Sequence, residues 1–337
     1  MLFMMNSNKM FFLFIMFFST LISISSNSWL GCWIGLEINL LSFIPLMSNP
    51  NNLLNSEASL KYFLTQSIAS INFLFSILLC MLLMKNFFID NMLSIIINSS
   101  LLMKMGSAPF HFWFPNIMEG LSWLNCFILM TWQKISPMIL LSYYLNFNLL
   151  FFLMVINVMI STISSYNQYS LRKLMAFSSI NNLGWMLASL SISENLWLIY
   201  FLLYSLFISI MCFLFYMLNI YFINQLFNFN WNFFIKIYIM INFLSLGGLP
   251  PFLGFFPKWM IINYLLFNNL FIILFFFLMS SLIMLFIYIR IIYSSFMFFH
   301  IKLKWNKMYI KNKYLNFINI FSLISLLGML LSTLFFF

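Results

Sequence analysis

The chain has 337 residues, of which 64% are hydrophobic and 6% are charged, and its mean hydropathy is +1.03. Soluble globular domains carry about 25% charged residues, so this composition excludes a water-soluble fold, and its high hydrophobicity excludes intrinsic disorder. The net charge of +10 comes from basic residues scattered among apolar runs, which excludes a nucleic-acid-binding surface. The composition therefore predicts an all-α polytopic membrane protein.

Apolar runs of about 20 residues, the length that crosses a bilayer as a helix, recur along the whole chain. Eleven such runs predict about eleven transmembrane helices in a single membrane domain over residues 1–337. The first run resembles a signal peptide, but we expect it to be retained because ten further spans follow it. The runs cover residues 9–25, 29–47, 57–84, 90–116, 120–143, 149–166, 171–191, 194–221, 233–266, 270–299 and 315–336.

The distribution of basic residues predicts the orientation of these helices. If the helices alternate in direction, the loops on one side hold nearly all of the basic residues, and the other side shows only Lys85. Positive charge marks the inner side, so the amino terminus faces inward and the carboxyl terminus outward. The cluster from Lys302 to Lys313 belongs to this signal, or alternatively forms a lipid-binding or partner-binding patch. The basic residues of the inner side are Lys9, Lys61, Arg172, Lys173, Lys302, Lys304, Lys307, Lys311 and Lys313.

Two of the eleven spans are interrupted by glycine and proline, at residues 106–115 and 247–257. Irregular backbone at membrane depth is stable only where protein or a wet cavity surrounds it. Both breaks contain Pro-Phe-x-x-x-Phe-Pro, at 109–115 and 251–257, and they lie five helices apart. This match predicts inverted repeats of five helices, approximately 9–143 and 149–299, followed by a C-terminal helix at approximately 315–336. A chance match in a Phe-rich chain is the alternative.

Most charged residues lie at the ends of the runs, but four do not, and a charge at a helix centre costs about 2.5 to 3.5 kcal/mol on insertion scales. They are Glu37, Lys104, Lys134 and Lys258. A single glutamate cannot neutralise three lysines, so the surplus charge must meet water or partners, or lose a proton. A buried lysine that loses and regains its proton is a relay element, whereas the alternative is a set of paired structural struts. We predict that these four residues form a proton relay.

Three further observations complete the set of candidate sites. His111 lies beside the first break and could carry protons from there to the inner surface, although a packed, hydrogen-bonded histidine is the alternative. Pro137 follows Lys134 by three residues and should loosen its helix. Four dispersed cysteines, two histidines and five acids are too few for a metal centre or a redox cofactor, and we expect neither.

Five motifs occur in a fixed order along the chain. They are Trp-x-Gly-Leu-Glu-x-Asn-Leu-Leu-Ser-Phe-Ile-Pro at 33–45, Ala-Pro-Phe-His-Phe-Trp-Phe-Pro at 108–115, Trp-Gln-Lys-Ile-Ser-Pro at 132–137, Leu-Arg-Lys-Leu-Met-Ala-Phe-Ser-Ser-Ile-Asn-Asn-Leu-Gly-Trp at 171–185 and Gly-Gly-Leu-Pro-Pro-Phe-Leu-Gly-Phe-Phe-Pro-Lys-Trp at 247–259. With them the chain resembles the mitochondrially encoded chain 2 family of NADH-ubiquinone oxidoreductase, respiratory complex I, in its insect-type form. The resemblance is nearly full-length and strongest from residue 29 to residue 295.

The resemblance implies an antiporter-like, proton-translocating subunit in the membrane arm of this enzyme complex. NADH oxidation and ubiquinone reduction would take place in sibling subunits, and this chain would hold no flavin, iron-sulfur cluster or quinone. Its partners would be other membrane-arm and accessory subunits and membrane lipids such as cardiolipin. The chain would lie in the mitochondrial inner membrane, with its amino terminus on the matrix side and its carboxyl terminus on the intermembrane-space side.

The family's proton-path residues correspond by motif to Glu37, Lys104, Lys134 and Lys258. Asn182 departs from the family pattern, in which a histidine is frequent, so the resemblance assigns no role to this position. Two other functions stay open at this point. One is a free-standing cation/proton antiporter, and the other is a purely structural spacer of the membrane arm.

Overall fold

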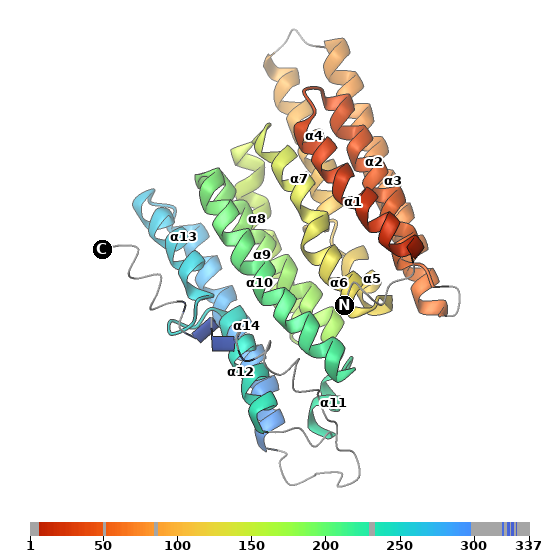
Figure 1. Ribbon diagram of the computed structural model, residues 1–337. Helices are drawn as coiled ribbons and strands as arrows, with labels where there is room; N and C mark the ends of the chain where they lie inside the picture. Colours follow the sequence, from red (N-terminus) through yellow and green to blue (C-terminus); the bar gives the residue numbers. More distant parts are fainter. Residues whose placement is uncertain are drawn as a thin grey trace. The chain divides into compact units, whose positions relative to one another are not determined.

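The computed structural model describes residues 7–49, 52–83, 87–228 and 233–297, together with six positions between 319 and 328. These residues form helices joined by turns, with an isolated bridge between Ser170 and Phe222. The chain divides into two units, Met1–Leu153 and Met154–Phe337, and α8 (Phe147–Ser165) crosses their boundary (Figure 1).

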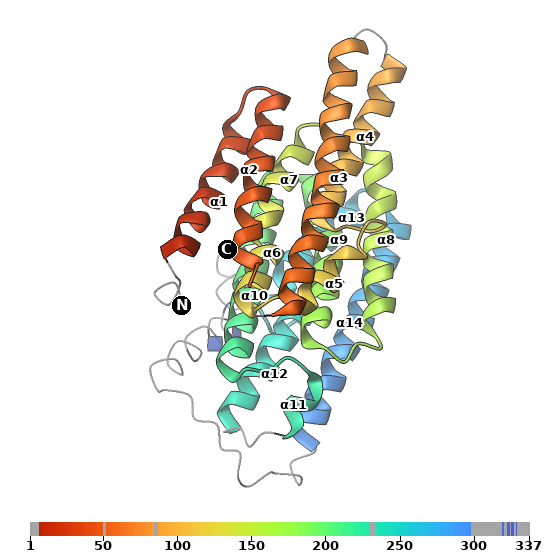
Figure 2. The ribbon, with the colours of Figure 1, turned by 90° about the vertical axis from the view of Figure 1, so that its right-hand side faces the viewer.

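The first unit is a bundle in which helices run side by side: α1 packs on α2, and α3 packs on α2, α4 and α5 (Figure 2). Gly35 lets α2 approach α1 closely, because a Cβ atom at this position would lie 2.7 Å from the Cβ of Ser23. Small residues are favoured at such contacts between membrane helices. The helices are α1 (Ser7–Ser25), α2 (Trp29–Met47), α3 (Leu53–Leu83), α4 (Phe87–Met105), α5 (Trp113–Gly120), α6 (Trp123–Met130) and α7 (Trp132–Ser142).

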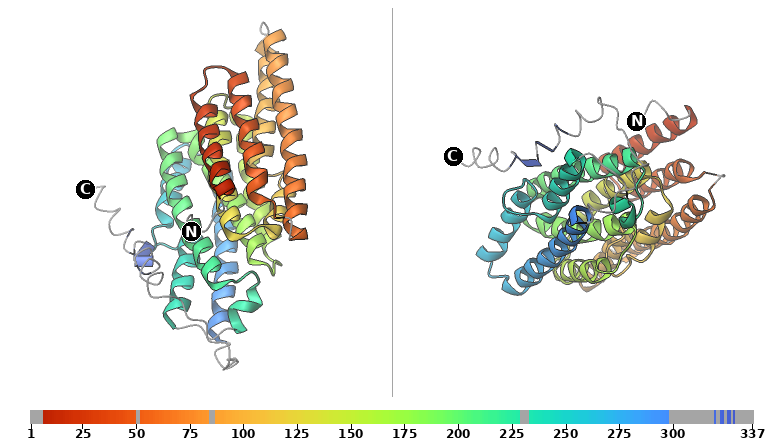
Figure 3. Two further views of the ribbon diagram at one scale, coloured as in Figure 1. Left: turned by 45° about the vertical axis from the view of Figure 1, so that its right-hand side comes forward. Right: turned by 90° about the horizontal axis from the view of Figure 1, so that it is seen from below.

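In the second unit, α10 packs on α9 and α12, and α14 lies along α12 and α13 (Figure 3). The short α11 was not expected from the sequence, where its residues follow the eighth apolar run. The helices of this unit after α8 are α9 (Leu171–Ile192), α10 (Glu194–Leu218), α11 (Ile223–Asn228), α12 (Phe233–Gly247), α13 (Phe255–Phe267) and α14 (Phe271–Met297).

The helices confirm the predicted fold class. Among the described residues, seven helical segments are long and apolar enough to cross a membrane, and three shorter apolar helices accompany them. Each of the first ten predicted spans coincides with a helix or with two helices separated by a break. The eleventh, at 315–336, lies largely outside the described residues.

Helix α9 has the length of a membrane span but is more polar than the other long helices, with Ser178, Ser179, Asn181 and Asn182 in its middle. Residues 174–190 of this helix are all buried. A helix surrounded by protein needs no apolar face toward lipid, so it can carry polar side chains that bond to its neighbours. The polar composition of α9 therefore marks an interior helix.

The first predicted break follows α4 and begins with a glycine in the left-handed region. Gly106 has φ +71°, its amide donates to the carbonyl of Met103 (3.2 Å), and the amide of Ser107 donates to the carbonyl of Leu102 (3.1 Å). These two bonds form a Schellman motif, which ends a helix by satisfying its last carbonyls. The break is therefore an ordered helix end inside the protein.

The second predicted break ends α12 in the same way. Gly248 has φ +80°, its amide donates to the carbonyl of Ser245 (3.1 Å), and the amide of Leu249 donates to the carbonyl of Leu244 (3.3 Å). Gly106 and Gly248 each stand three residues before the proline of the shared Pro-Phe-x-x-x-Phe-Pro pattern. The likeness of the two breaks extends from sequence to hydrogen bonding and supports the prediction of internal repeats.

The predicted span 120–143 contains an irregularity that lies before Pro137. Helix α6 ends at Met130 and α7 begins at Trp132, with Thr131 between them at φ −115° and ψ −73°. A proline crowds the carbonyl four residues earlier, so distortion falls on its N-terminal side. The carbonyl that Pro137 crowds is that of Gln133, and the irregularity at Thr131 lies two residues before it, while Pro137 itself lies inside α7.

Candidate functional site

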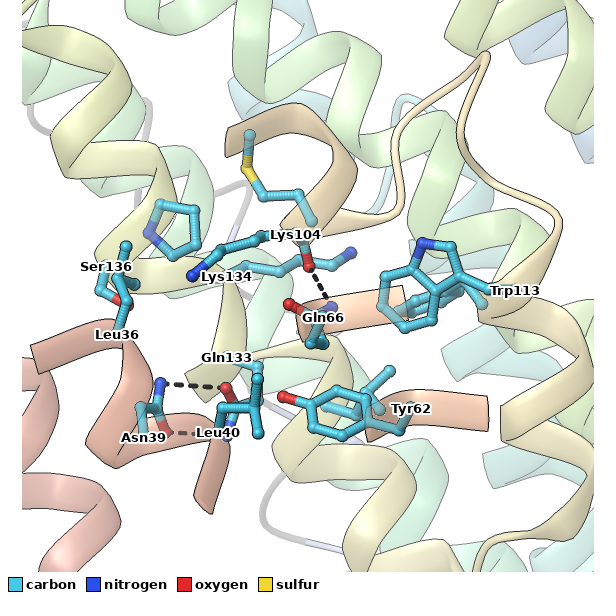
Figure 4. Close-up of a pocket in the computed structure, with 14 residues that line it drawn as sticks. Leu36, Asn39, Leu40, Tyr62, Gln66, Lys104, Trp113, Gln133, Lys134 and Ser136 are labelled. Carbon is cyan, nitrogen blue, oxygen red and sulfur yellow. Dashed lines mark hydrogen bonds between the residues drawn. The ribbon is translucent and has the colours of Figure 1, made fainter. Parts of the chain in front are cut away.

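The first unit contains a polar cavity into which two of the predicted relay residues project (Figure 4). It offers about 20 Å³ to the centres of water molecules, enough for about one water. Five helices (α2, α3, α4, α6 and α7) and the start of α5 contribute to its wall. The lining residues are Leu36, Asn39, Leu40, Tyr62, Gln66, Lys104, Met105, Trp113, Phe114, Leu129, Gln133, Lys134, Ser136 and Pro137.

Lys134 is the most deeply buried of the predicted relay residues, with 1% of its surface exposed. It lies on α7 just after the irregularity at Thr131, and its ammonium is 5.3 Å from the centre of the Phe114 ring. A cation over an aromatic face is stabilised without a formal counter-charge. The nearby hydroxyl of Ser136 is buried and has no hydrogen-bond partner in the protein, so it is free to bond a water in the cavity.

Lys104 lies in the last turn of α4, immediately before the Schellman motif at Gly106. The carboxyl end of a helix carries a partial negative charge that stabilises a cation there. The side-chain amide of Gln66 on α3 donates to the carbonyl of Lys104 (3.1 Å), which fixes this helix end against α3. The carboxylate of the half-buried Glu37 interacts electrostatically with the Lys104 ammonium. Two of the four predicted relay residues, Lys104 and Lys134, therefore come together on one cavity, and Glu37 lies on α2, which also lines it.

A pair of amide side chains joins α2 to α7 across the cavity. Asn39 donates to the Oε1 of Gln133 (3.0 Å), and Gln133 donates back to the Oδ1 of Asn39 (3.1 Å), as Figure 4 shows. Asn39 lies two residues after Glu37, and Gln133 directly precedes Lys134. The pair therefore links the two helices that carry these charged residues. Sequence reasoning missed it, since neither amide carries a charge, although both lie within the motifs that marked the family.

Lys258 belongs to the second unit and lies near the start of α13, directly after the second break. Its ammonium donates to the carbonyls of Gly247 (2.9 Å) and Leu246 (3.4 Å), the last residues of α12. It also lies 5.7 Å from the centre of the Trp185 ring. Gly248 makes this approach possible, because a Cβ atom there would come within 3.0 Å of the lysine Nζ. The break in the ninth span thus creates the site that a buried lysine occupies.

Lys258 lines a second cavity, again with about 20 Å³ for the centres of water molecules. Its polar lining comes from α9, α10 and the end of α12, including the hydroxyl of Tyr200, which donates to the Oδ1 of Asn182 (3.0 Å). The sequence drew attention to Asn182 only as a departure from the family and did not identify Tyr200. The full lining is Asn182, Tyr200, Leu203, Tyr204, Phe207, Ser245, Leu246, Gly254, Pro257 and Lys258.

His111, the fifth predicted site residue, lies in the first break and does not line the cavity of the first unit. Its Nδ1 is 3.3 Å from the carbonyl oxygen of Pro109, and its ring centre is 4.2 Å from that of Phe112. This environment resembles the packed, hydrogen-bonded alternative. A role in carrying protons to the inner surface stays a prediction.

Lys236 on α12 is a buried lysine that sequence reasoning missed, with 7% of its surface exposed. It lies close to the start of the predicted span 233–266, where a lysine would ordinarily extend toward the membrane surface. Residues of α11 and α14 cover it, so its burial follows from packing that the sequence did not reveal. The apolar residues around its small cavity are Leu226, Ile239, Met240, Phe243, Ile291 and Ile292.

Comparison with known proteins places these features in a family. Residues 26–284 match the family model for the NADH:quinone oxidoreductase/Mrp antiporter transmembrane region. The chain is 48% identical to NADH-ubiquinone oxidoreductase chain 2 of Anopheles gambiae, with 95% of each chain covered. It is 49% identical to the protein of the same name from Aedes aegypti, with 97% of each chain covered.

Solved structures share the same fold at much lower sequence identity. A chain of respiratory complex I from Thermus thermophilus matches with a TM-score of 0.83 and 19% identity, covering 97% of this chain and 79% of that one. A chain of the Mrp complex from Dietzia sp. DQ12-45-1b matches with a TM-score of 0.75 and 13% identity, covering 83% and 59%. These matches establish an antiporter-like membrane fold.

Proposed function

Because the chain belongs to the NADH:quinone oxidoreductase/Mrp antiporter transmembrane family, we propose that it is a proton-translocating subunit in the membrane arm of respiratory complex I. Its relatives at 48% and 49% identity carry the name of a chain of that enzyme and are covered almost completely. NADH oxidation and ubiquinone reduction then take place in sibling subunits, and we assign no cofactor to this chain. The proposal places it in the mitochondrial inner membrane with the amino terminus toward the matrix.

The observation that carries the proton-transfer role is the pair of buried lysines on one cavity, Lys104 and Lys134. A lysine in such a place can exist in charged and neutral forms, because burial removes the solvation that keeps an exposed ammonium charged. One water in the cavity can exchange protons with both side chains. The cavity of the first unit therefore supports the proposal that Lys104 and Lys134 carry protons.

Charge on one member of this set can drive a proton on or off another. At about 8 Å and an effective dielectric constant near 20, one unit charge changes the energy of a neighbour by about 2 kcal/mol. That energy corresponds to about a thirtyfold change in proton occupancy. Glu37 acts electrostatically on Lys104, so a change of charge at Glu37 would shift the proton equilibrium of Lys104. We propose that protons enter from the matrix, load this set and Lys258, and leave toward the intermembrane space.

Replacement of the buried lysines in the assembled complex tests the proposal. We expect Lys104→Met and Lys258→Met each to lower the number of protons pumped per NADH oxidised in sealed membrane vesicles. Lys61→Met is the matched control, because Lys61 is 47% exposed and its 2.6 Å ion pair with Glu57 lies within one helix. An unchanged ratio in both buried variants would instead favour a structural spacer.

A free-standing cation/proton antiporter is the remaining alternative, and the match to a chain of the Mrp complex gives it the same fold. The two functions differ in their partners. Mass spectrometry of the chains that co-purify with this protein would show other subunits of complex I if the proposal holds. Purification alone, with ion exchange by the isolated chain in liposomes, would support the antiporter.

A further inference from the structure

Three buried tyrosines surround the polar middle of α9 in the second unit. Tyr200 and Tyr204 lie on α10 and Tyr288 lies on α14, and each is 2% or 3% exposed. The Tyr200 hydroxyl is bonded to Asn182, while Tyr204 and Tyr288 lie beside two serines of α9, Ser179 and Ser178. All three tyrosines are therefore directed toward polar side chains of α9.

Tyr200 and Tyr204 line the cavity of Lys258, and Tyr288 does not. The hydroxyl of Tyr200 is bonded to the amide of Asn182, whereas Tyr204 lies beside a serine. A phenolic hydroxyl has one donor and two acceptor sites. The donor of Tyr200 is committed to the Oδ1 of Asn182 (3.0 Å), an amide oxygen that can only accept. The oxygen of Tyr200 therefore keeps its acceptor capacity for the cavity.

Lys258 has a hydrogen-bond donor available for the same cavity. Its ammonium has three donors, and the two backbone carbonyls of Leu246 and Gly247 leave at least one of them for the cavity. The cavity has room for about one water. A water there can accept from Lys258 and donate to Tyr200, which uses the remaining donor of Lys258 and one acceptor site of Tyr200.

We propose that Tyr200 is a positioning residue for Lys258: Asn182 orients the Tyr200 hydroxyl so that its oxygen holds the water that solvates the Lys258 ammonium. The inference rests on the proposed function, in which Lys258 binds and releases a proton. The pair of Asn182 and Tyr200 then favours the charged form of Lys258 without placing a second charge in the membrane. An uncharged acceptor has this advantage because it needs no counter-ion of its own.

Four helices contribute the groups that surround Lys258, and Tyr200 is among them. From α9 come Asn182 and the Trp185 ring, from α10 come Tyr200 and Tyr204, and from α12 come Ser245 and two backbone carbonyls. From α14, Tyr288 lies against the backbone of Gly247. Among the described residues that line this cavity, Lys258 is the charged side chain, and the tyrosines are the other titratable ones.

The test is the pH profile of proton pumping by the assembled complex. Tyr200→Phe keeps the ring and removes the hydroxyl, so Lys258 should bind its proton about tenfold less tightly, the effect of losing one hydrogen bond to a charged group. The alkaline limb of the profile should then move about one pH unit toward lower pH. Tyr216→Phe is the matched control, because Tyr216 lies on the same helix and is 38% exposed.

A second variant shows whether the two residues act as a unit. Asn182→Leu removes the group that orients Tyr200 and should move the alkaline limb in the same direction. The double variant should move it no further than Tyr200→Phe alone, because coupled residues are not additive. If one variant fails to assemble, the other still gives the shift.

The outcomes separate this inference from the proposed function. If Lys258→Met abolishes or lowers pumping while Tyr200→Phe has the pH profile of Tyr216→Phe, the role of Tyr200 is excluded and the function stands. If Lys258→Met leaves pumping unchanged, the proton-path role of Lys258 fails, and the inference fails with it. Independent, additive shifts from Tyr200→Phe and Asn182→Leu would exclude the orienting role of Asn182.

Discussion

At the residue scale, each unit has a positive-φ glycine that makes room for a buried lysine. Gly248 does so directly, since a Cβ atom would lie 3.0 Å from the Nζ of Lys258. Gly106 does so indirectly, because a Cβ atom there would lie 3.0 Å from the ring of Phe114. The ammonium of Lys134 lies over this ring. The sequence showed both glycines as helix breakers. Their contacts with the lysine sites depend on how the chain folds back after each break.

We expect Gly248→Ala to impair proton pumping and to destabilise the chain. The left-handed conformation costs a non-glycine residue about 1 to 2 kcal/mol, and the added methyl group would press against Lys258. Gly247→Ala is the control, because its Cβ would lie 3.4 Å from the Tyr288 ring, an ordinary contact. Thermal inactivation and the proton-to-NADH ratio of the two variants give the comparison. Equal values for both would mean that the space beside Lys258 is not required.

At the element scale, the lengths of the apolar runs predict most of the helices, and the breaks within the runs have local causes in the sequence. The first ten predicted spans coincide with helices, and both predicted breaks are ordered helix ends. The irregularity near Lys134 lies at Thr131, between α6 and α7. The link between α2 and α7 through Asn39 and Gln133 could not be predicted, since helices so far apart in sequence are paired only by tertiary packing.

The amide pair of Asn39 and Gln133 gives a test of this link. Asn39→Leu or Gln133→Leu leaves the partner amide without its bonds and should destabilise the chain by about 1 to 3 kcal/mol. The double variant replaces both amides by apolar groups and should recover part of the loss. Thermal denaturation of the assembled complex measures all three variants. A double variant that is less stable than either single variant would contradict a direct pairing.

At the scale of the whole molecule, the charge asymmetry predicts which loops face the matrix. Lys61 and Lys173 should lie on that side, and Lys85, which lies outside the described residues, should lie on the other. The predicted repeats, 9–143 and 149–299, stay a prediction that the two similar breaks support.

Surface labelling of natural lysines tests this topology. In mitoplasts, where only the outer face of the inner membrane is accessible, a membrane-impermeant amine reagent should modify Lys85 and leave Lys61 and Lys173 unmodified. Inverted inner-membrane vesicles should give the opposite pattern, read by mass spectrometry of the peptides. Modification of Lys61 in intact mitoplasts would reverse the proposed orientation.

The membrane class, the helical spans, the two breaks and the four charges away from the ends of the runs could be predicted from the chain alone, because bilayer thickness and the cost of a buried charge act on each segment locally. The sequence also indicated the family, because the motifs that mark it are contiguous in the chain. The tertiary structure alone decided that Lys104 and Lys134 share a cavity, that Lys236 is buried, and that Asn182 and Tyr200 are bonded beside Lys258. These relations join side chains on different helices, and they arise only when the helices pack.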